Sequence, residues 1–424
     1  MINMSINARW ILIILLLCHS PIKWAAGLIL LLIAPVFLYK LKLKSEETIT
    51  IISFFSILIL GSLVNLLNNQ NIYGILFGVL LVIPSVLLVI IFSKIARPDD
   101  TAKALKIFTV IQALTISIQY SLIALTTGKL NIFSVNKSYG DWLAGTFLSF
   151  STPLAVTFAF ISIFFLDLFF KKTEKSYLIF SVISVLITLL TGAMSVFLSL
   201  LPVITAFSAY KIYNSNIKKS YKLFVGLFFI LVSTGFFFIQ QSNFMYADHM
   251  YSQAKDKTLP FKFELALNVL NNATDPNKYM FGVGIGNFSS RASLFLSGQY
   301  LENQLFVPVS PSQESRDAIL PYFNVRNRGA LVNGFDSLSV VSEPFSQYTT
   351  MISEYGILGG AIFCSLIIYY LLASRKRKSN LTVYVLLSTV LFVINSWLEY
   401  PSFSAIFFLL LATEIRYRKE HQHA

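Results

Sequence analysis

The chain has 424 residues, of which 55% are hydrophobic and only 12% are charged. A soluble domain carries about 25% charged residues, so this composition and the mean hydropathy of +0.69 indicate a membrane protein built from many apolar helices. The net charge of +13 is concentrated in short turns between apolar runs. It forms no basic stripe with interleaved aromatic residues, which argues against nucleic-acid binding.

The apolar runs predict an all-α polytopic membrane protein with about twelve transmembrane helices, in a range of ten to twelve. In chain order the spans are 9–20, 22–39, 48–67, 73–93, 106–127, 143–170, 177–191, 193–210, 222–240, 345–372, 380–397 and 402–415. Pro21 can merge the first two spans, and only Thr191-Gly192 separates the seventh from the eighth. The chain therefore divides into residues 1–240 with nine helices, a loop at 241–344, and residues 345–424 with three helices and the C-terminus.

The two cysteines, Cys18 and Cys364, both lie inside apolar runs. This placement is typical of small buried hydrophobic residues rather than of a disulfide or a metal site. Arg9 precedes the first apolar run, but no small-residue cleavage site follows it, so we expect a retained first span. No Cys/His cluster has zinc spacing and no paired acids suit a divalent cation, so we expect neither a metal nor a cofactor.

The orientation follows from the basic turns. One alternate set of turns, together with Arg9, carries 22 of the 33 Lys and Arg residues. Short basic turns face the cytoplasm, so we expect both termini in the cytoplasm and the large loop outside. Asp167 lies four residues before Lys171 near the cytoplasmic end of its span, and this spacing favours an ion pair at the interface.

Residues 241–343 form the one long polar segment of the sequence. They contain eight of the 33 basic residues and nine of the 20 acids. The Gly-rich stretch 279–288 contains Gly284 and Gly286 but lacks the strand–helix context of a dinucleotide fingerprint. Arginines suit bidentate contacts to phosphate, and the candidates for a lipid diphosphate are Arg291, Arg316, Arg326 and Arg328. The alternative is a set of solvated surface charges.

A second outward segment, 128–142, offers Lys137 and Asp141 as supporting groups. It leads into 144–160, where Gly145-Thr146 and Pro153 interrupt helix periodicity. Such a break can turn backbone N–H groups toward a polar ligand. A plain helix cap explains the same residues.

Carboxylates and a histidine near the outer surface are candidates for proton transfer or for binding sugar hydroxyls. The candidate bases are His249, Glu343 and Glu354, and Glu399 occupies the next outward turn. Because Tyr355 to Leu372 is long enough to cross a membrane alone, we expect Glu354 at the outer rim, with Glu399 at a similar depth. Simple interfacial solvation is the alternative for these carboxylates.

Three short motifs stand out: the G-x-G-x-G-N-F stretch 282–288, the E-x-G-I-L-G stretch 354–359, and Ala144-Gly145-Thr146-Phe147 followed by Pro153. Together they resemble motifs of the O-antigen polymerase and O-antigen ligase superfamily. The layout of many spans and one large outward loop before the last few spans is also similar. The resemblance implies a GT-C-like membrane glycosyltransferase in the bacterial inner membrane, with a periplasmic loop and glycan substrates carried on undecaprenyl diphosphate. Other implied partners are membrane lipids and a chain-length regulator protein.

Two departures from the family pattern bear on the activity. Ser346-Gln347 stands where the family often has His-Asn, and Ala193-Met194 follows Thr191-Gly192 where Ser-Arg is common. Ligases use a loop histidine, so these departures favour a divergent polymerase over a ligase. A polysaccharide flippase is the alternative from another class, although the sequence lacks the matching halves and midplane charges that many transporters have.

Overall fold

Every regular element in the part of the chain described by the computed structural model is a helix. The described residues are 4–21, 23–39, 41, 43–67, 72–129, 143–148, 151–214, 226, 276–286, 290, 346–376 and 380–422. The longer helices are α1 (Ile6–Cys18), α2 (Lys23–Leu38), α3 (Ser45–Leu67), α4 (Ile72–Ile95), α5 (Pro98–Thr127), α7 (Ser151–Lys172), α8 (Lys175–Leu190), α9 (Met194–Asn214), α16 (Gln347–Lys376), α17 (Leu381–Ile394) and α18 (Pro401–Gln422). Short helices are η2 (Gly145–Phe147), α13 (Pro276–Phe281) and η3 (Trp397–Glu399).

These helices identify a helical membrane protein. Six of the described helices are long and apolar enough to cross a membrane, namely α3, α4, α5, α7, α9 and α16. The shorter helices α1, α2, α8 and α17 are apolar as well. The helix positions agree with the expected spans, whereas the expectation of twelve crossings stays a prediction. The expected span 222–240 lies outside the described residues apart from Gly226.

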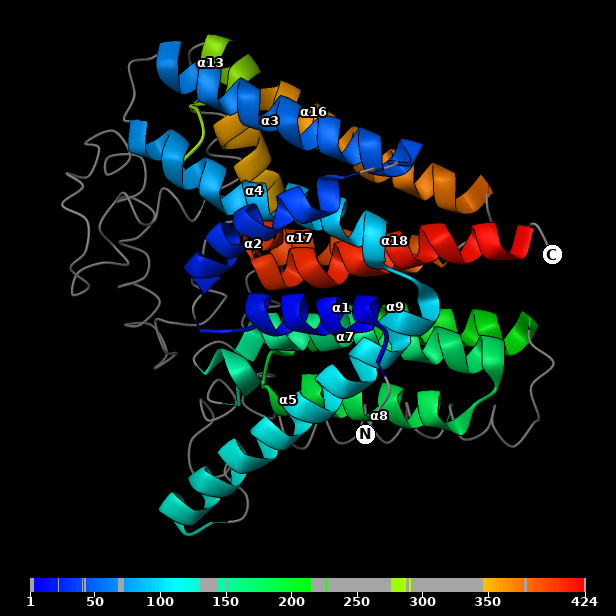
Figure 1. The fold of residues 1–424 in the computed structure, drawn as a ribbon. Coiled ribbons are helices and arrows are strands. Elements are labelled where there is room, and N and C mark those ends of the chain that lie inside the picture. Colours follow the sequence, from blue (N-terminus) through cyan, green and yellow to red (C-terminus); the bar gives the residue numbers. More distant parts are fainter. Residues whose placement is uncertain are drawn as a thin grey trace, which may run out of the picture.

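Helices α7 and α18 form the centre of the bundle (Figure 1). Residues 153–169 of α7 and 402–415 of α18 are all buried. A helix that is apolar on every side is stable only when other helices surround it, and α7 packs against α8, α9 and α18. Phe160 of α7 lies edge-on to Phe403 of α18, with ring centroids 5.8 Å apart.

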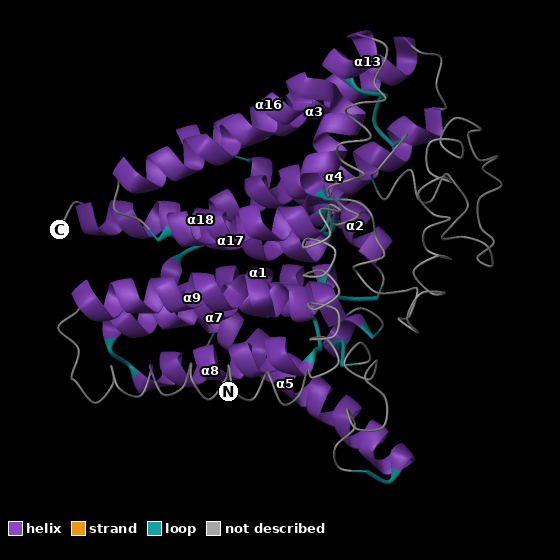
Figure 2. Cartoon of the chain, turned by 180° about the vertical axis from the view of Figure 1, so that it is seen from behind, coloured by secondary structure: helices purple, strands orange, loops and turns teal. Residues whose placement is uncertain are grey.

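Helix α5 begins eight residues before the expected span. Pro98 stands at its first turn with Asp99 and Asp100, a combination that favours a helix start. Figures 1 and 2 show the far half of α5 diverging from the bundle. Apolar side chains are exposed along that half, including Leu122 and Leu125, which suits a surface in contact with lipid.

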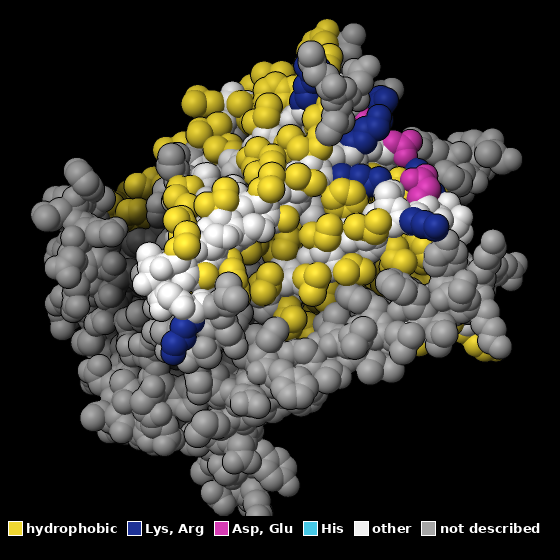
Figure 3. Space-filling model, turned by 90° about the horizontal axis from the view of Figure 1, so that it is seen from below, with side chains coloured by type: hydrophobic (Ala, Val, Ile, Leu, Met, Phe, Trp, Pro, Cys, Tyr) yellow, Lys and Arg dark blue, Asp and Glu magenta, His cyan; other side chains and the backbone are white. Residues whose placement is uncertain are grey.

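The bundle has two distinct ends. We call the end where α4 stops and α5 starts the basic end, and the end where α3 stops and α4 starts the loop end. Lys94, Lys171, Lys172 and Lys211 all lie in the last turns of helices at the basic end. Figure 3 shows a broad apolar surface with charged side chains gathered mainly toward one edge. That pattern matches helices that lie in lipid with their ends at the water interface.

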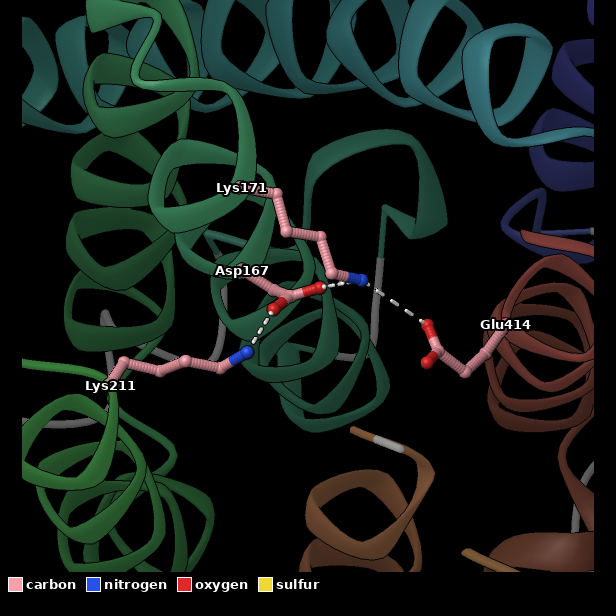
Figure 4. Close-up of polar contacts among 4 residues, drawn as sticks. All are labelled: Asp167, Lys171, Lys211 and Glu414. Atoms are coloured by element: carbon pink, nitrogen blue, oxygen red, sulfur yellow. Dashed lines mark ion pairs between the residues drawn. The ribbon is translucent and has the colours of Figure 1, made fainter. Parts of the chain in front are cut away.

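The expected pair of Asp167 and Lys171 is confirmed and belongs to a larger network at the basic end (Figure 4). The carboxylate of Asp167 lies 2.7 Å from Lys171 Nζ and 2.9 Å from Lys211 Nζ. Lys171 also lies 3.7 Å from Glu414. The network therefore joins α7, α9 and α18 through two acids and two lysines, so the charges balance within it.

Four of the longer described helices are too short to cross a bilayer alone. Helices α1, α2, α8 and α17 have 13, 16, 16 and 14 residues, whereas a span needs about 20. Three of them, α1, α8 and α17, end toward the loop end in a buried polar residue, respectively His19, Thr191 and Asn395. Irregular backbone at membrane depth is stable only where protein or water satisfies its polar groups. These polar turns therefore lie within the bundle rather than in lipid.

Candidate functional site

Two of the motifs noted in the sequence meet at the loop end of the bundle. The turn after α13 runs alongside the first half of α16, although the two are about 70 positions apart in the sequence. The N–H of Val283 donates to the carbonyl of Ser353 at 2.9 Å, and the N–H of Gly284 donates to the carbonyl of Glu354 at 3.0 Å. The G-x-G-x-G and E-x-G motifs are thus bound to each other through their backbones.

The side chain of Glu354 completes this contact. Its Oε2 accepts the N–H of Gly286 at 2.7 Å, and its Oε1 accepts the N–H of Ser290 at 2.7 Å. Glu354 is fully buried. Bonds from N–H groups to a carboxylate are about twice as strong as neutral ones. We call this arrangement the Glu354 clamp, because one carboxylate holds both Gly286 and Ser290.

Helices α3 and α4 hold the other side of the same turn. The N–H of Ile285 donates to the carbonyl of Gly61 at 3.3 Å, and Asn65 Nδ2 donates to the carbonyl of Ile285 at 2.7 Å. The Ile285 side chain is fully buried and lies directly against Gly61 and Gly78. The apolar residue of the Gly-rich turn therefore anchors it in the bundle.

Glycine is required where the two motifs cross. Gly282 and Gly356 have φ values of 78° and 66°, which L-residues with a side chain rarely adopt. A β-carbon on Gly356 would overlap the carbonyl of Met280, and one on Gly282 would overlap the backbone of Glu354. Gly356 also breaks α16 into two helical parts. The expected membrane-crossing part, from Tyr355 onward, begins at this break.

The structure describes four of the predicted site residues. They are Glu354, Gly284, Gly286 and Glu399. The first three belong to the clamp described above. The other eight lie outside the described residues, namely His249, Glu343, Arg291, Arg316, Arg326, Arg328, Lys137 and Asp141. Their roles stay predictions.

Glu354 lies near the loop end. Its carboxylate is buried and accepts hydrogen bonds from two backbone N–H groups. Gly286, which it binds, lies against Gly74 in the first turn of α4. The engaged carboxylate indicates that Glu354 positions the Gly-rich turn. Each oxygen keeps a further lone pair, but the residue is fully buried, so a substrate could reach the carboxylate only if the surrounding chain moved.

Glu399 belongs to η3, which is held by Ser85 in the middle of α4 through a 3.1 Å bond to the carbonyl of Leu398. Ser85 is 11 positions beyond Gly74, which corresponds to about 16 Å along a helix axis. The segments that carry Glu354 and Glu399 are therefore held at different turns of α4, and the similar membrane depth expected for the two carboxylates stays a prediction.

A second, partly buried polar cluster surrounds the Gly145-Thr146 turn. Gln112 of α5 accepts the N–H of Thr146 at 3.0 Å and donates to its hydroxyl at 2.7 Å. Gln119 accepts the N–H of Gly145 at 2.9 Å. The Thr146 hydroxyl donates to the carbonyl of His19 at 2.9 Å. The N–H groups of this break thus bind glutamine side chains of α5, an arrangement that neither the ligand-facing prediction nor the helix-cap alternative described.

His19 was not among the predicted site residues. Its Nδ1 donates to the carbonyl of Leu15 at 2.7 Å, so Nδ1 carries a proton. Its Nε2 lies 2.7 Å from the hydroxyl of Thr157 in α7. The His19 ring therefore links α1 to α7, and the backbone carbonyl of the same residue links α1 to Thr146. The only sequence signal was a histidine at the end of an apolar run.

No group of three or more metal-ligating side chains occurs within the described ranges. A cavity of about 30 Å³ lies beside Leu398 among Phe363, Phe392 and Phe408, and it is apolar. It is about the size of one water molecule, so neither a sugar nor a lipid fits it.

Comparison with known proteins adds no family to these observations: no protein-family model, no curated protein and no solved structure matches this chain.

Proposed function

We propose that this chain is an O-antigen polymerase of the Wzy type. Such an enzyme is a membrane glycosyltransferase that joins repeat units carried on undecaprenyl diphosphate, at the periplasmic face of the bacterial inner membrane. The observation that carries the proposal is the Glu354 clamp, in which the two family-like motifs bind each other. A chance resemblance of two short motifs gives no reason for them to meet in the fold.

The clamp also bears on diphosphate binding. Arg291 directly follows Ser290, whose N–H bonds to Glu354. Because of this position in the sequence, Arg291 is the first candidate for binding the diphosphate. In the proposed reaction the leaving group is a lipid diphosphate, and a guanidinium held near the loop end would stabilise its charge. Arg316, Arg326 and Arg328 are the further candidates for this role.

The remaining task of the protein is to orient two large substrates. The non-reducing-end hydroxyl of one lipid-linked repeat unit attacks the anomeric carbon of the other, and the lipid diphosphate leaves. For the proton of that hydroxyl we propose His249 or Glu343 as the acceptor. Glu354 becomes a positioning residue, because its two oxygens hold the Gly-rich turn.

Deletion of the gene, followed by analysis of the lipopolysaccharide, tests the proposal. Loss of a polymerase leaves core carrying one repeat unit, and re-expression of the chain restores the ladder. Bare core after deletion indicates a ligase instead. Accumulation of lipid-linked repeat units on the cytoplasmic side indicates a flippase.

The role of Arg291 is tested in the same strain. We expect Arg291→Ala to lower the amount of polymer about tenfold or more, because a bond between charged groups contributes about 1.5–3 kcal/mol. Arg291→Lys keeps the charge but not the bidentate geometry, so we expect an intermediate ladder. Arg97→Ala is the matched control, because Arg97 is exposed at the start of α5. A normal ladder with Arg291→Ala contradicts the role assigned to this arginine.

A further inference from the structure

The Gly-rich turn lies below the level at which two neighbouring helices end. Ile285 packs against Gly61 of α3 and Gly78 of α4. Gly61 is six positions before Leu67, the last residue of α3. Gly78 is six positions after Ile72, the first residue of α4. Six residues correspond to about 9 Å along a helix axis, so both helices continue by about this length past the turn toward the loop end.

The continuing end of α3 is apolar and exposed. Leu63, Leu66 and Leu67 are 51%, 59% and 81% exposed, and Ile72 at the start of α4 is exposed as well. Exposed apolar side chains up to the last turn of a membrane helix indicate that lipid surrounds that turn. The Gly-rich turn therefore lies at a depth where the periphery of the bundle contacts lipid.

The short helix α13, which leads into the turn, lies on this periphery. It packs against α16 and α3, and Figure 1 shows it beside the last turns of α3. Three consecutive side chains of α13, Tyr279, Met280 and Phe281, are 42%, 42% and 39% exposed. Ile357 and Leu358, which follow the break in α16, are exposed too. The exposed apolar surface of α3 and α16 thus continues onto α13.

Every backbone N–H group of residues 282–286 has an acceptor in the protein. The first donates to the carbonyl of Lys278 at 2.8 Å. The next four donate to Ser353 and Glu354 of α16 and to Gly61 of α3. Irregular backbone at membrane depth is stable only where protein or water satisfies its polar groups. A turn in water could leave some of these groups to the solvent, whereas a turn at lipid depth needs the complete pairing that the structure shows.

The side chains of α13 suit the boundary between lipid and water. Lys278 and Tyr279 combine an apolar body with a polar end, which favours the level of lipid headgroups. Met280 and Phe281 are apolar and follow in the chain, next to the buried turn. This order matches a chain that enters the lipid from the headgroup level.

We propose that residues 278–286 re-enter the leaflet at the loop end, with Met280 and Phe281 against lipid acyl chains and Lys278 at the level of the lipid phosphates. The partner of this exposed surface is the bilayer lipid itself. The long polar segment, which the sequence predicts to lie outside the membrane, is then attached to the membrane here as well as to the bundle. This placement follows from the fold and not from the proposed polymerase activity.

Nitroxide labels on α13 measure whether lipid surrounds it. Single cysteines, Met280→Cys or Phe281→Cys, are introduced into the full-length chain with Cys18→Ala and Cys364→Ser, and the labelled proteins are placed in lipid bilayers. Collisions of the label with oxygen, which concentrates in lipid, are compared with collisions with a nickel chelate, which stays in water. The ratio of the two collision rates reports the surroundings of the side chain.

Two exposed positions calibrate this ratio. Leu114→Cys, at a position 61% exposed on α5, is the lipid control, and Glu174→Cys, in the exposed turn before α8, is the water control. We expect Met280→Cys and Phe281→Cys to give ratios close to the lipid control and above the water control. Ratios equal to the water control overturn the proposal. Few collisions with either reagent also overturn it, because protein, such as a second copy of this chain, then covers α13.

A second measurement uses the free-energy cost of a charge in lipid. Met280→Asp places a carboxylate where we infer acyl chains, so we expect a lower unfolding temperature in lipid nanodiscs. Met280→Leu keeps an apolar side chain and should unfold at the temperature of the parent. Equal unfolding temperatures for the two variants overturn the proposal. Neither measurement depends on glycan analysis, so a failure of the polymerase proposal leaves the result for α13 unchanged.

Discussion

The two hydrogen bonds of Glu354 decide what this residue can do. Each carboxylate oxygen binds a backbone N–H at 2.7 Å, and the side chain is fully buried, so a substrate hydroxyl cannot reach the carboxylate in this arrangement. These backbone donors cannot move away unless Gly286 and Ser290 themselves move. A rim carboxylate, which the sequence suggested as a base, therefore serves best as the attachment point of the long polar segment.

Substitution of Glu354 should lower stability before it alters chemistry. Glu354→Gln keeps one acceptor oxygen but turns an amide donor toward the second N–H, so we expect about 1.5–3 kcal/mol of destabilisation. Glu354→Ala leaves both N–H groups without this partner and should cost more. Thermal unfolding in detergent measures both, and Glu174→Gln, at an exposed position, serves as the control. Unchanged stability with full loss of polymer would restore the assignment of Glu354 as a base.

Between elements, the Gly282 turn and the broken helix α16 cross at close range. Gly356 interrupts α16 at the point where the chain changes direction, and the turn lies so close that neither glycine has space for a side chain. The break separates the first part of α16, which begins at Gln347, from the longer part that follows Gly356. This geometry fixes Glu354 beside Gly286.

Gly356→Ala should therefore destabilise the protein by about 3 kcal/mol or more, because it combines backbone strain with steric overlap. Gly128→Ala provides a matched control. Gly128 also has a positive φ of 67°, at the end of α5, but nothing lies within 4 Å of an added β-carbon. We expect only the strain there, about 1 kcal/mol. Equal unfolding temperatures for the two variants would contradict the close crossing.

The ion network at the basic end joins helices that are distant in sequence. Lys211→Met removes one of the two lysines on Asp167, whose side chain is only 4% exposed. We expect about 1–3 kcal/mol of destabilisation, less than for a pair that is lost completely, because Lys171 remains. Lys172→Met breaks the pair with Asp99, whose side chains are 33% and 77% exposed, and should change stability by about 0–1 kcal/mol. Thermal unfolding compares the two, and a larger effect of Lys172→Met would contradict the importance of burial.

The helices could be located from the sequence because apolar runs set their positions directly. Span 48–67 corresponds to α3 (Ser45–Leu67), and span 345–372 to α16 (Gln347–Lys376). The sequence indicated a break at Gly145-Thr146. It did not indicate that Gln112 and Gln119 would bind the backbone N–H groups there. The Glu354 clamp could not be predicted either. It depends on backbone N–H groups, which every residue except proline carries, and no side-chain pattern marks which of them a carboxylate will bind.

At the scale of the whole molecule, the two ends differ in what they contain. The basic end has lysines in the last helical turns and the ion network, whereas the loop end has the clamp and the buried glycine turn. A glycan polymerase that acts outside the cytoplasm needs the loop end to face the periplasm. The bias of Lys and Arg toward the other end is the physical reason to expect that orientation.

Labelling of single cysteines tests this orientation independently of activity. In a variant with Cys18→Ala and Cys364→Ser, a cysteine replaces Tyr279 of α13 at the loop end or Tyr213 of α9 at the basic end. These side chains are 42% and 88% exposed, so a maleimide that does not cross membranes can reach either one from its own side. We expect labelling of Tyr279→Cys in spheroplasts, whose inner membrane is intact, and of Tyr213→Cys only after that membrane is permeabilised. The reverse pattern would place the loop end in the cytoplasm, where the lipid-linked substrates of the proposed reaction are not presented, and would remove the basis for the polymerase while leaving the Glu354 clamp and the bundle unchanged.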